Sequence, residues 1–277
     1  SEGSRFDCEY LVVAPGRSGA EWFSGAAEDL GLRLNNNVVD IGVRVEVPAP
    51  VMEPLTEELY EPKLIYYSKN SDDRVRTFCM NPYGVVIKER YGDVLTVNGH
   101  SWAETRTGNT NFALLVDKRF TEPFREPIAY GRYIARLANL LGDGILVQRL
   151  GDLLAGRRSN DKRIARSTVK PTLPEATPGD LSLVLPFRYL SDVLEMLYAL
   201  EALTPGVFSK STLLYGVEVK FYSSQLKVSG ELESEVRNMF GAGDGVGLTR
   251  GLVQASASGL LAAESIRKRA GGPGVSQ

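Results

Sequence analysis

A glycine-rich turn with one acidic residue, MFGAGDGVG at 239–247, has the clearest chemical potential in this sequence. Asp244 is a hydrogen-bond acceptor that suits sugar-like hydroxyl groups. Three glycines beside it would let a ligand approach the backbone closely: Gly243, Gly245 and Gly247. Because position 246 is valine, the turn does not match the G-x-G-x-x-G pattern of a dinucleotide-binding turn. The combination favours the ribityl chain and ring of a flavin, and a turn that merely precedes a buried helix is the alternative.

The residues after this turn predict a helix from about Leu248 to Arg269. The first amides of a helix have no partner within it, and its N-terminus carries a partial positive charge, which favours a phosphate or an electron-rich carbonyl. Small residues recur every four positions and predict a smooth ridge for close backbone packing: Gly251, Ala255, Gly259 and Ala263.

The sequence does not identify a catalytic residue, and only a few other polar side chains are candidates for that role. His100 is the single histidine of the sequence and could relay protons beside a flavin, although a hydrogen-bonded turn residue is the favoured interpretation. Asn98, Asn109 and Asn111 could hold a polar substrate, but their surroundings favour simple turn formation. The candidates are therefore His100, Asn98 and Asn111.

A basic segment, LAGRRSNDKRIARSTVK at 154–170, holds six basic residues against one acid. A solvated loop is the favoured interpretation, because most charge runs are simply hydrated. The alternatives are an anionic substrate, the phosphate of a pyridine nucleotide, or RNA, with Arg157, Arg158 and Arg163 as the anion-binding candidates. No aromatic residues alternate with these arginines, which argues against stacking of unpaired bases.

Composition indicates a folded, globular protein. Of 277 residues, 43% are hydrophobic and 24% are charged, and 32 basic residues nearly balance 34 acidic ones, so no global field attracts nucleic acid or a membrane. Cys8 and Cys79 form no CxxC pair, and Cys79 is interpreted as a buried apolar residue rather than a redox thiol. We therefore expect no metal site, no apolar run long enough to span a membrane, and a reducing cytoplasm.

The order of elements predicts a discontinuous, mixed α/β architecture. A strand, turn and helix open the chain, and a strand, turn and helix close it. Between them, residues 64–118 predict an antiparallel sheet, and two helices are expected near 128–142 and 187–203. We expect residues 1–50 and 211–277 to form part of a Rossmann-like FAD-binding domain, and 51–210 to form an inserted substrate domain.

The closing stretch, NMFGAGDGVGLTRGLVQASASGLLAAESI, resembles the C-terminal flavin motif of bacterial and archaeal FAD-dependent dehydrogenases, often named NAD(FAD)-utilising dehydrogenases. Nearly all of the chain is similar to successive family segments in the same order: LVVAPGRSGAEW, DIGVRVEVP, FCMNPYG, VNGHS, TGNTNFALLV, FTEPFREPIAYG, LVQRLGDLLAGRRS and LLYGVEVKFYSS. The resemblance implies a flavoprotein of the two-dinucleotide-binding-domain type, with the turn at 241–247 near the ribityl and isoalloxazine groups.

The resemblance also implies roles for particular residues. Ala14, Gly16 and Arg17 would form a turn facing the cofactor, and Asp244 would accept hydrogen bonds from ribityl hydroxyls. The glycines named above would allow the cofactor to approach. Amides near the pyrimidine edge of the flavin would come from Leu248, Thr249 and Arg250.

The resemblance implies an oxidoreductase that passes electrons between FAD and a small substrate, with NAD(P)H as a possible donor. Family members are similar over a longer chain with an N-terminal G-x-G-x-x-G, which does not occur in this sequence. We therefore expect the chain to supply part of the FAD site, to need the N-terminal half of the FAD domain as partner, and to be inactive alone. The alternative function is a non-catalytic module that binds RNA or another polyanion through residues 157–170.

Overall fold

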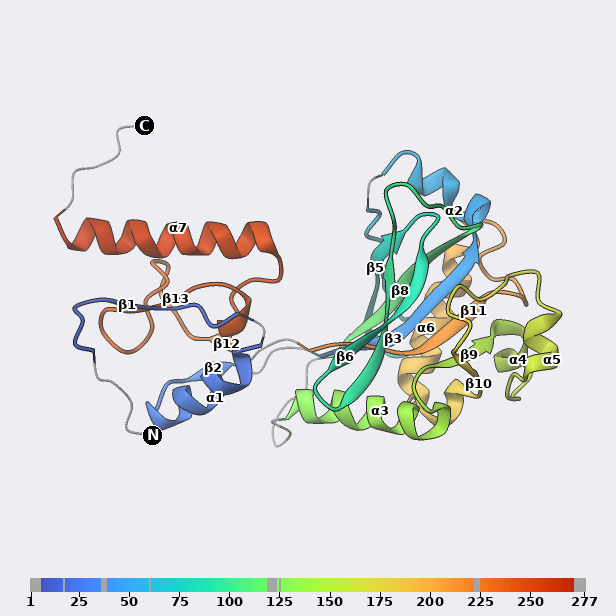
Figure 1. Ribbon diagram of the computed structural model, residues 1–277, viewed down its shortest axis with the longest axis horizontal. Helices are drawn as coiled ribbons and strands as arrows, with labels where there is room; N and C mark the ends of the chain where they lie inside the picture. Colours follow the sequence, from blue (N-terminus) through green and yellow to red (C-terminus); the bar gives the residue numbers. More distant parts are fainter. Residues whose placement is uncertain are drawn as a thin grey trace. The chain divides into compact units, whose positions relative to one another are not determined.

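The chain folds into two compact units, described here from a computed structural model that covers residues 6–16, 18–35, 39–59, 61–118, 124, 126–221 and 225–271. One unit combines Ser1–Asn37 with Tyr222–Gln277, and the other is Val38–Phe221 (Figure 1). The mixed α/β fold is confirmed. The units divide at 37/38 and 221/222 rather than at the expected 50/51 and 210/211, because strands on both sides of the insertion belong to the sheet of the second unit.

The first unit contains a parallel strand pair, an antiparallel strand pair and two helices. Its elements are β1 (Leu11–Val13), α1 (Ala20–Asp29), β2 (Leu34–Asn35), β12 (Gln225–Leu226), β13 (Met239–Gly241), the 3-10 helix η2 (Asp244–Val246) and α7 (Leu252–Arg269). β1 pairs in parallel with β13, and β2 pairs antiparallel with β12. Phe23 and Ala27 of α1 pack on Met239 and Val246, so the core joins the opening and closing segments of the chain.

The last helix begins later than the sequence predicts. It starts at Leu252 instead of about Leu248, because the glycine-rich stretch before it takes conformations that a helix does not. Gly247 has a left-handed φ of 73°, and Gly251 is extended at the N-cap. The amide of Arg250 donates to Gln254 Oε1 at 3.2 Å, which satisfies one donor at the start of the helix.

A seven-stranded sheet forms the centre of the second unit, in the order β10-β9-β11-β3-β8-β5-β4. Its strands are β3 (Val39–Pro48), β4 (Ile65–Tyr67), β5 (Arg74–Asn81), β8 (Asn109–Lys118), β9 (Leu146–Arg149), β10 (Thr177–Pro178) and β11 (Leu213–Lys220). β10 runs parallel to β9, and the other neighbours are antiparallel. The antiparallel pairing expected over 64–118 is confirmed.

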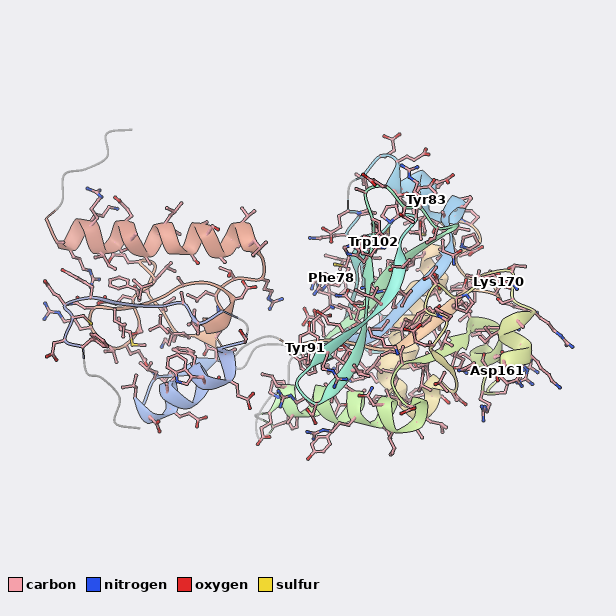
Figure 2. All side chains as sticks on the ribbon, viewed as in Figure 1. Phe78, Tyr83, Tyr91, Trp102, Asp161 and Lys170 are labelled. Carbon is pink, nitrogen blue, oxygen red and sulfur yellow. The ribbon has the colours of Figure 1, made fainter. Side chains whose placement is uncertain are left out.

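Each face of this sheet is covered. Helices α3 (Pro127–Gly142) and α6 (Phe187–Leu200) pack on one face, together with α2 (Ala49–Thr56). A hairpin of β6 (Val85–Tyr91) and β7 (Val94–His100) packs on the other, and Figure 2 labels Tyr91 close to its turn. The connections after β9 include the short elements α4 (Leu150–Leu154), α5 (Asp161–Ala165) and η1 (Leu181–Leu183).

The central strand β3 is buried on both faces. Ile41, Val43, Val45 and Val47 alternate into the core beneath the helices, as the sequence predicts. The alternate residues of β3 face the hairpin side and include three buried ionisable residues: Asp40, Arg44 and Glu46. β3 also runs very close to β8, because a Cβ atom on Gly42 would lie 1.8 Å from the carbonyl oxygen of Leu114. Only glycine fits there.

We predict that Gly42→Ala destabilises the second unit by about 3 kcal/mol, since the added methyl group forces the paired strands β3 and β8 apart. Chemical denaturation followed by circular dichroism measures this loss. Gly108→Ala is the matched control, because a Cβ at Gly108 meets no atom within 4 Å. Equal unfolding midpoints for the two variants would contradict the close approach.

Candidate functional site

An apolar groove of about 600 Å³ lies in the first unit, at the ends of β1 and β13 and along the start of α7. Ten residues line it: Val12, Ala14, Gly16, Ala242, Gly243, Asp244, Gly251, Leu252, Ala255 and Gly259. Parallel pairing of β1 with β13 brings both strand ends to one edge, because Val13 is in register with Gly241. Asp244 is the one charged residue of this lining.

The two glycine turns that contribute to the groove touch each other. A Cβ on Gly245 would lie 2.2 Å from the carbonyl oxygen of Gly16, so these backbones are in direct contact. Gly16 and Gly243 both have a positive φ, at 68° and 81°, which side chains other than glycine rarely adopt. The missing side chain of Gly245 therefore serves contact between the two turns.

Hydrogen bonds within the turn fix the carboxylate of Asp244 and the backbone beside it. Thr249 Oγ1 donates to Asp244 Oδ1, and the amide of Gly247 donates to the Asp244 carbonyl at 3.0 Å. The amide of Gly243 donates to Ser258 Oγ of α7 at 2.9 Å. These contacts hold the turn against the helix and orient Asp244 at the groove.

Four of the residues predicted from the sequence line the groove together: Ala14, Gly16, Gly243 and Asp244. Gly245, Gly247, Leu248, Thr249 and Arg250 lie behind or beyond it, because η2 and the bend after it precede the helix. Arg17 lies outside the described residues. Whether any of these residues contacts a cofactor stays a prediction.

The groove also contains residues that the sequence did not assign to a site. Gly251, Ala255 and Gly259 belong to the four-residue ridge that was expected to pack against another backbone, and in this chain they line the groove. Cβ atoms on Gly251 and Gly259 would meet nothing within 4 Å. The four-residue repeat was therefore the sequence feature that could have identified these groove residues. No sequence feature indicated Val12 or Ala242.

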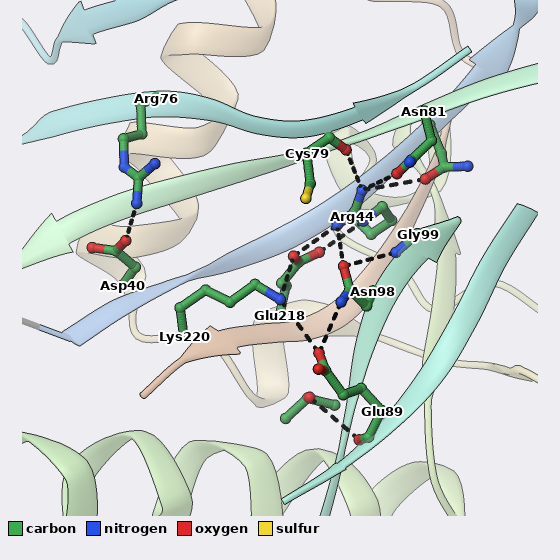
Figure 3. Close-up of polar contacts among 12 residues, drawn as sticks. Asp40, Arg44, Arg76, Cys79, Asn81, Glu89, Asn98, Gly99, Glu218 and Lys220 are labelled. Carbon is green, nitrogen blue, oxygen red and sulfur yellow. Dashed lines mark hydrogen bonds and ion pairs between the residues drawn. The ribbon is translucent and has the colours of Figure 1, made fainter. Parts of the chain in front are cut away.

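In the second unit, Arg44 is fully buried at the centre of a polar cluster (Figure 3). Its Nε and Nη2 donate to the two carboxylate oxygens of Glu218 at 2.8 and 2.7 Å. Its Nη1 donates to the carbonyl of Cys79 at 2.8 Å, and further acceptors are the side-chain oxygens of Asn81, Asn98 and Asn111. The bidentate ion pair and these further hydrogen bonds together satisfy the donors of the guanidinium with acceptors from several strands.

Two of the three catalytic candidates are part of this cluster. Asn98 and Asn111 lie on β7 and β8, not in turns, and both accept hydrogen bonds from Arg44. Asn98 also donates to Glu89 Oε2 at 2.9 Å, while Lys220 Nζ lies 3.1 Å from Glu218 Oε1. The expected turn roles of these asparagines are corrected, since strand pairing brings them to a buried charge.

The third candidate, His100, lies exposed at the end of β7, and its ring contacts Trp102 edge to face with centroids 4.5 Å apart. Cys79 lies at an irregularity in the pairing of β5 with β8, and burial raises the pKa of its thiol. A raised pKa favours the protonated thiol, which argues against a redox role, but Cys79 is partly exposed rather than fully buried as the sequence analysis expected.

Glu46 forms a second buried polar centre, next to Arg44 along β3. Thr172 Oγ1 and Tyr215 OH donate to its carboxylate, each at 2.5 Å, and Asn109 Nδ2 donates at 3.0 Å. Burial raises the pKa of Glu46, and these hydrogen bonds offset part of the rise. Asn109, expected in a turn, thus ties β8 to the segment after α5, where its Nδ2 also donates to the Lys170 carbonyl at 2.8 Å.

The basic segment folds around one buried acid, Asp152 of α4, which is 1% exposed. Arg157 Nε lies 3.0 Å from Asp152 Oδ1, Arg163 Nε lies 3.7 Å from the same atom, and Arg149 Nη1 lies 3.9 Å from Oδ2. Arg158 instead donates to the carbonyl of Ser159. Arg157 and Arg163 are therefore held by a buried carboxylate. The other basic residues of the segment are exposed, as expected for a solvated segment: Arg158, Lys162, Arg166 and Lys170.

The described residues hold no metal-binding cluster, membrane-spanning helix or disulfide. There, no group of three or more His, Cys, Asp or Glu side chains is arranged to hold a metal ion. No helix among the described residues is long and apolar enough to cross a membrane. Cys8 and Cys79 are both free thiols.

Comparison with known proteins places the second unit in a family. Residues 39–221, well over half of the chain, match the model of the FAD-dependent protein, C-terminal domain-like family. The chain therefore belongs to this family of FAD-dependent proteins. The matched range coincides with the compact unit Val38–Phe221, and the groove of the first unit lies outside it.

A relative extends the similarity to the first unit. The chain is 27% identical over 294 residues to an uncharacterized protein of Clostridium beijerinckii. The aligned region covers 95% of this chain and 52% of the relative. The chain thus spans about half the length of the curated relative that it matches.

We predict that Glu218→Ala lowers the free energy of unfolding by about 3–5 kcal/mol, because it leaves the buried charge of Arg44 without its carboxylate. Urea denaturation measures the change. Glu175→Ala is the control, since Glu175 pairs with Lys88 at the surface, with 52% of its side chain exposed. A loss for Glu218→Ala no greater than that of the control would show that Arg44 does not depend on the pair.

We also predict a pH dependence from Glu46. Because the folded chain raises the pKa of Glu46 above its unfolded value, its contribution to stability is complete below the ordinary value of about 4.3 and is lost as pH rises through the folded pKa. Glu46→Gln should therefore flatten the plot of unfolding free energy against rising pH. Denaturation at a series of pH values tests this, and a variant curve as steep as that of the wild type contradicts it.

Proposed function

We propose that this chain is the C-terminal part of a flavin-dependent oxidoreductase, and that the groove of the first unit takes the ribityl and isoalloxazine portion of FAD. Membership of a family of FAD-dependent proteins supports the cofactor. The groove supports its location, because it brings Ala14, Gly16, Gly243 and Asp244 together from opposite ends of the chain. That convergence is the single observation that carries the proposal.

The groove fits such a group in size and chemistry. Its volume of about 600 Å³ lies in the range of small-molecule and cofactor sites, and its lining is mostly small and apolar, as suits a flat ring. The open space at Gly251 and Gly259 would be narrowed by any side chain. A polar acceptor stands at one place, Asp244, where a hydroxylated chain needs a partner.

Each groove element has a role in this proposal. Asp244 accepts hydrogen bonds from ribityl hydroxyls, and its bond from Thr249 holds the carboxylate in position. The positive end of α7, at Leu252, favours the electron-rich edge of the ring and any negative charge that develops on it. The isoalloxazine supplies the hydride chemistry, and the chain binds and orients it.

We further propose that the remaining half of the FAD domain covers the groove. Among the described residues of the first unit, β1 and β13 form the one parallel pair, and Leu11 and Val12 of β1 are 47% and 44% exposed. On α7, Leu252 and Val253 are 89% and 84% exposed. Contiguous apolar side chains of this size usually mark an interaction surface, and the relative has about as many residues outside the matched region as within it.

For the substrate and the electron donor we propose chemical classes. The second unit is proposed to hold a small substrate, with NAD(P)H as the electron donor and His100 as the remaining candidate for proton transfer. Asn98 and Asn111 are not proposed for that role, because Arg44 engages both. The two free thiols support a reducing, cytoplasmic location.

We predict that a full-length family member containing this sequence is yellow when purified, or becomes so with added FAD, whereas this chain alone binds FAD weakly. Visible absorbance spectra and equilibrium dialysis measure both. Addition of NADH or NADPH without air should bleach the flavin band if either is the donor. A full-length protein that stays colourless with FAD supplied would contradict the proposal.

A variant within the groove gives a sharper test in the same full-length protein. Gly259→Leu fills open space without a clash in this chain, so it should lower FAD affinity about tenfold or more and leave the fold intact. Ala257→Leu is the control, since Ala257 is exposed on the same helix and does not line the groove. Equal FAD affinity for the two variants would place the flavin elsewhere.

A further inference from the structure

The arginine cluster around Asp152 has more positive charge than its buried acid can balance. Arg149, Arg157 and Arg163 all lie within 4 Å of the single carboxylate of Asp152. Over residues 149–166 there are six basic side chains and two acidic ones, and the second acid, Asp161, makes no ion pair with these arginines. Asp161 is the first residue of α5 and is labelled in Figure 2.

Asp152 uses only part of the hydrogen-bonding capacity of Arg157, whereas Arg163 also donates through Nη1 to the Arg158 carbonyl at 2.7 Å. Arg157 and Arg163 approach it through Nε, so the terminal nitrogens of Arg157 are left for another acceptor, and its side chain is 54% exposed. Ser159 Oγ donates to the other oxygen of Asp152 at 2.8 Å, which completes the buried side of the carboxylate. The carboxylate of Asp152 is thus enclosed, and Arg157 is the most exposed of its three arginine partners.

Arg149 is the least satisfied member of the cluster. Its side chain is 19% exposed, its contact with Asp152 is 3.9 Å long, and its buried Nε has no hydrogen-bond partner among the described residues. A largely buried guanidinium with an unused donor is costly unless an acceptor reaches it. The Nε itself is enclosed by the protein, so an anion shared with Arg157 would contact the terminal nitrogens of Arg149, which are not enclosed in this way.

We propose that Arg149, Arg157 and Arg163 form a binding site for a phosphoryl group of a small ligand, preorganised by Asp152. Guanidinium groups bind phosphate oxygens bidentately, and several of them around one point match the compact charge of one or two phosphoryl groups. A nucleic-acid backbone would instead need cations spaced along a track and, for single strands, aromatic side chains between them. The site is independent of the flavin groove.

The test uses the whole chain at constant ionic strength, with inorganic phosphate and pyrophosphate as probes in isothermal titration calorimetry. We expect saturable binding of pyrophosphate, weakened about tenfold or more by Arg157→Gln with Arg163→Gln. The matched control is Lys162→Gln with Arg166→Gln, which removes the same charge from the same segment and makes no contact with Asp152. The control should change the affinity less than about threefold.

Several outcomes would overturn the proposal. Equal weakening by the two double variants would mean a diffuse basic surface, and no binding of either probe would mean no site. If circular dichroism shows that the first double variant does not fold, Arg157→Lys replaces it. This change keeps the charge and removes the guanidinium group, so an unchanged affinity for pyrophosphate would count against the site.

A single-stranded RNA oligonucleotide forms the second arm, in the same buffer and with the same variants. RNA that competes with pyrophosphate and depends on Arg157 and Arg163 identifies a nucleic-acid backbone as the source of the phosphoryl group. That outcome overturns the assignment to a small ligand. RNA that does not compete with pyrophosphate, or does not bind, supports the small phosphorylated ligand.

Discussion

The second unit is organised around the ion pair of Arg44 and Glu218. A charge buried this completely is tolerated only if every donor finds an acceptor, and here the acceptors come from β5, β7, β8 and β11 around a guanidinium on β3. The pair therefore sets where the hairpin of β6 and β7 can lie. The hairpin approaches the cluster closely at Gly99, because a Cβ atom there would lie 2.1 Å from Asn111 Oδ1.

The first unit solves a different problem, since its site consists mainly of backbone. Small residues let the turn after β1 and the turn after β13 touch, and the glycines of α7 leave the space above them open. A groove with so few side chains gains specificity from shape and from one fixed acceptor, Asp244. The family match covers the other unit, so the two parts of the chain contribute different evidence to the flavin proposal.

The sequence predicts most elements, because they depend on local patterns. Alternation of Ile41, Val43, Val45 and Val47 identified the face of β3 beneath the helices, and glycine and proline marked most helix ends. The start of α7 was misplaced, since its N-cap is set by Gly251 and the side chain of Gln254 rather than by periodicity. Ala14, Gly16, Gly243 and Asp244 were grouped by resemblance, and the structure brings them to one groove.

Long-range polar partners could not be predicted from local patterns. Glu218 is 174 positions from Arg44, and nothing near either residue indicates the other. Asn98 and Asn111 have neighbours typical of turns, yet the buried guanidinium recruits both. The sequence analysis did not single out Asp152, and only the fold places three arginines around it.

The strands that begin and end the second unit are neighbours in its sheet, with Asp40 of β3 in register with Lys220 of β11. Adjacent strands lie about 4.8 Å apart, so the chain leaves this unit almost where it entered. A host domain could therefore accept all of residues 38–221 in place of a single tight turn. An ancestor of the first unit would have been able to acquire or exchange this insert without rebuilding its own strands, which makes the junction a natural point for recombination between proteins.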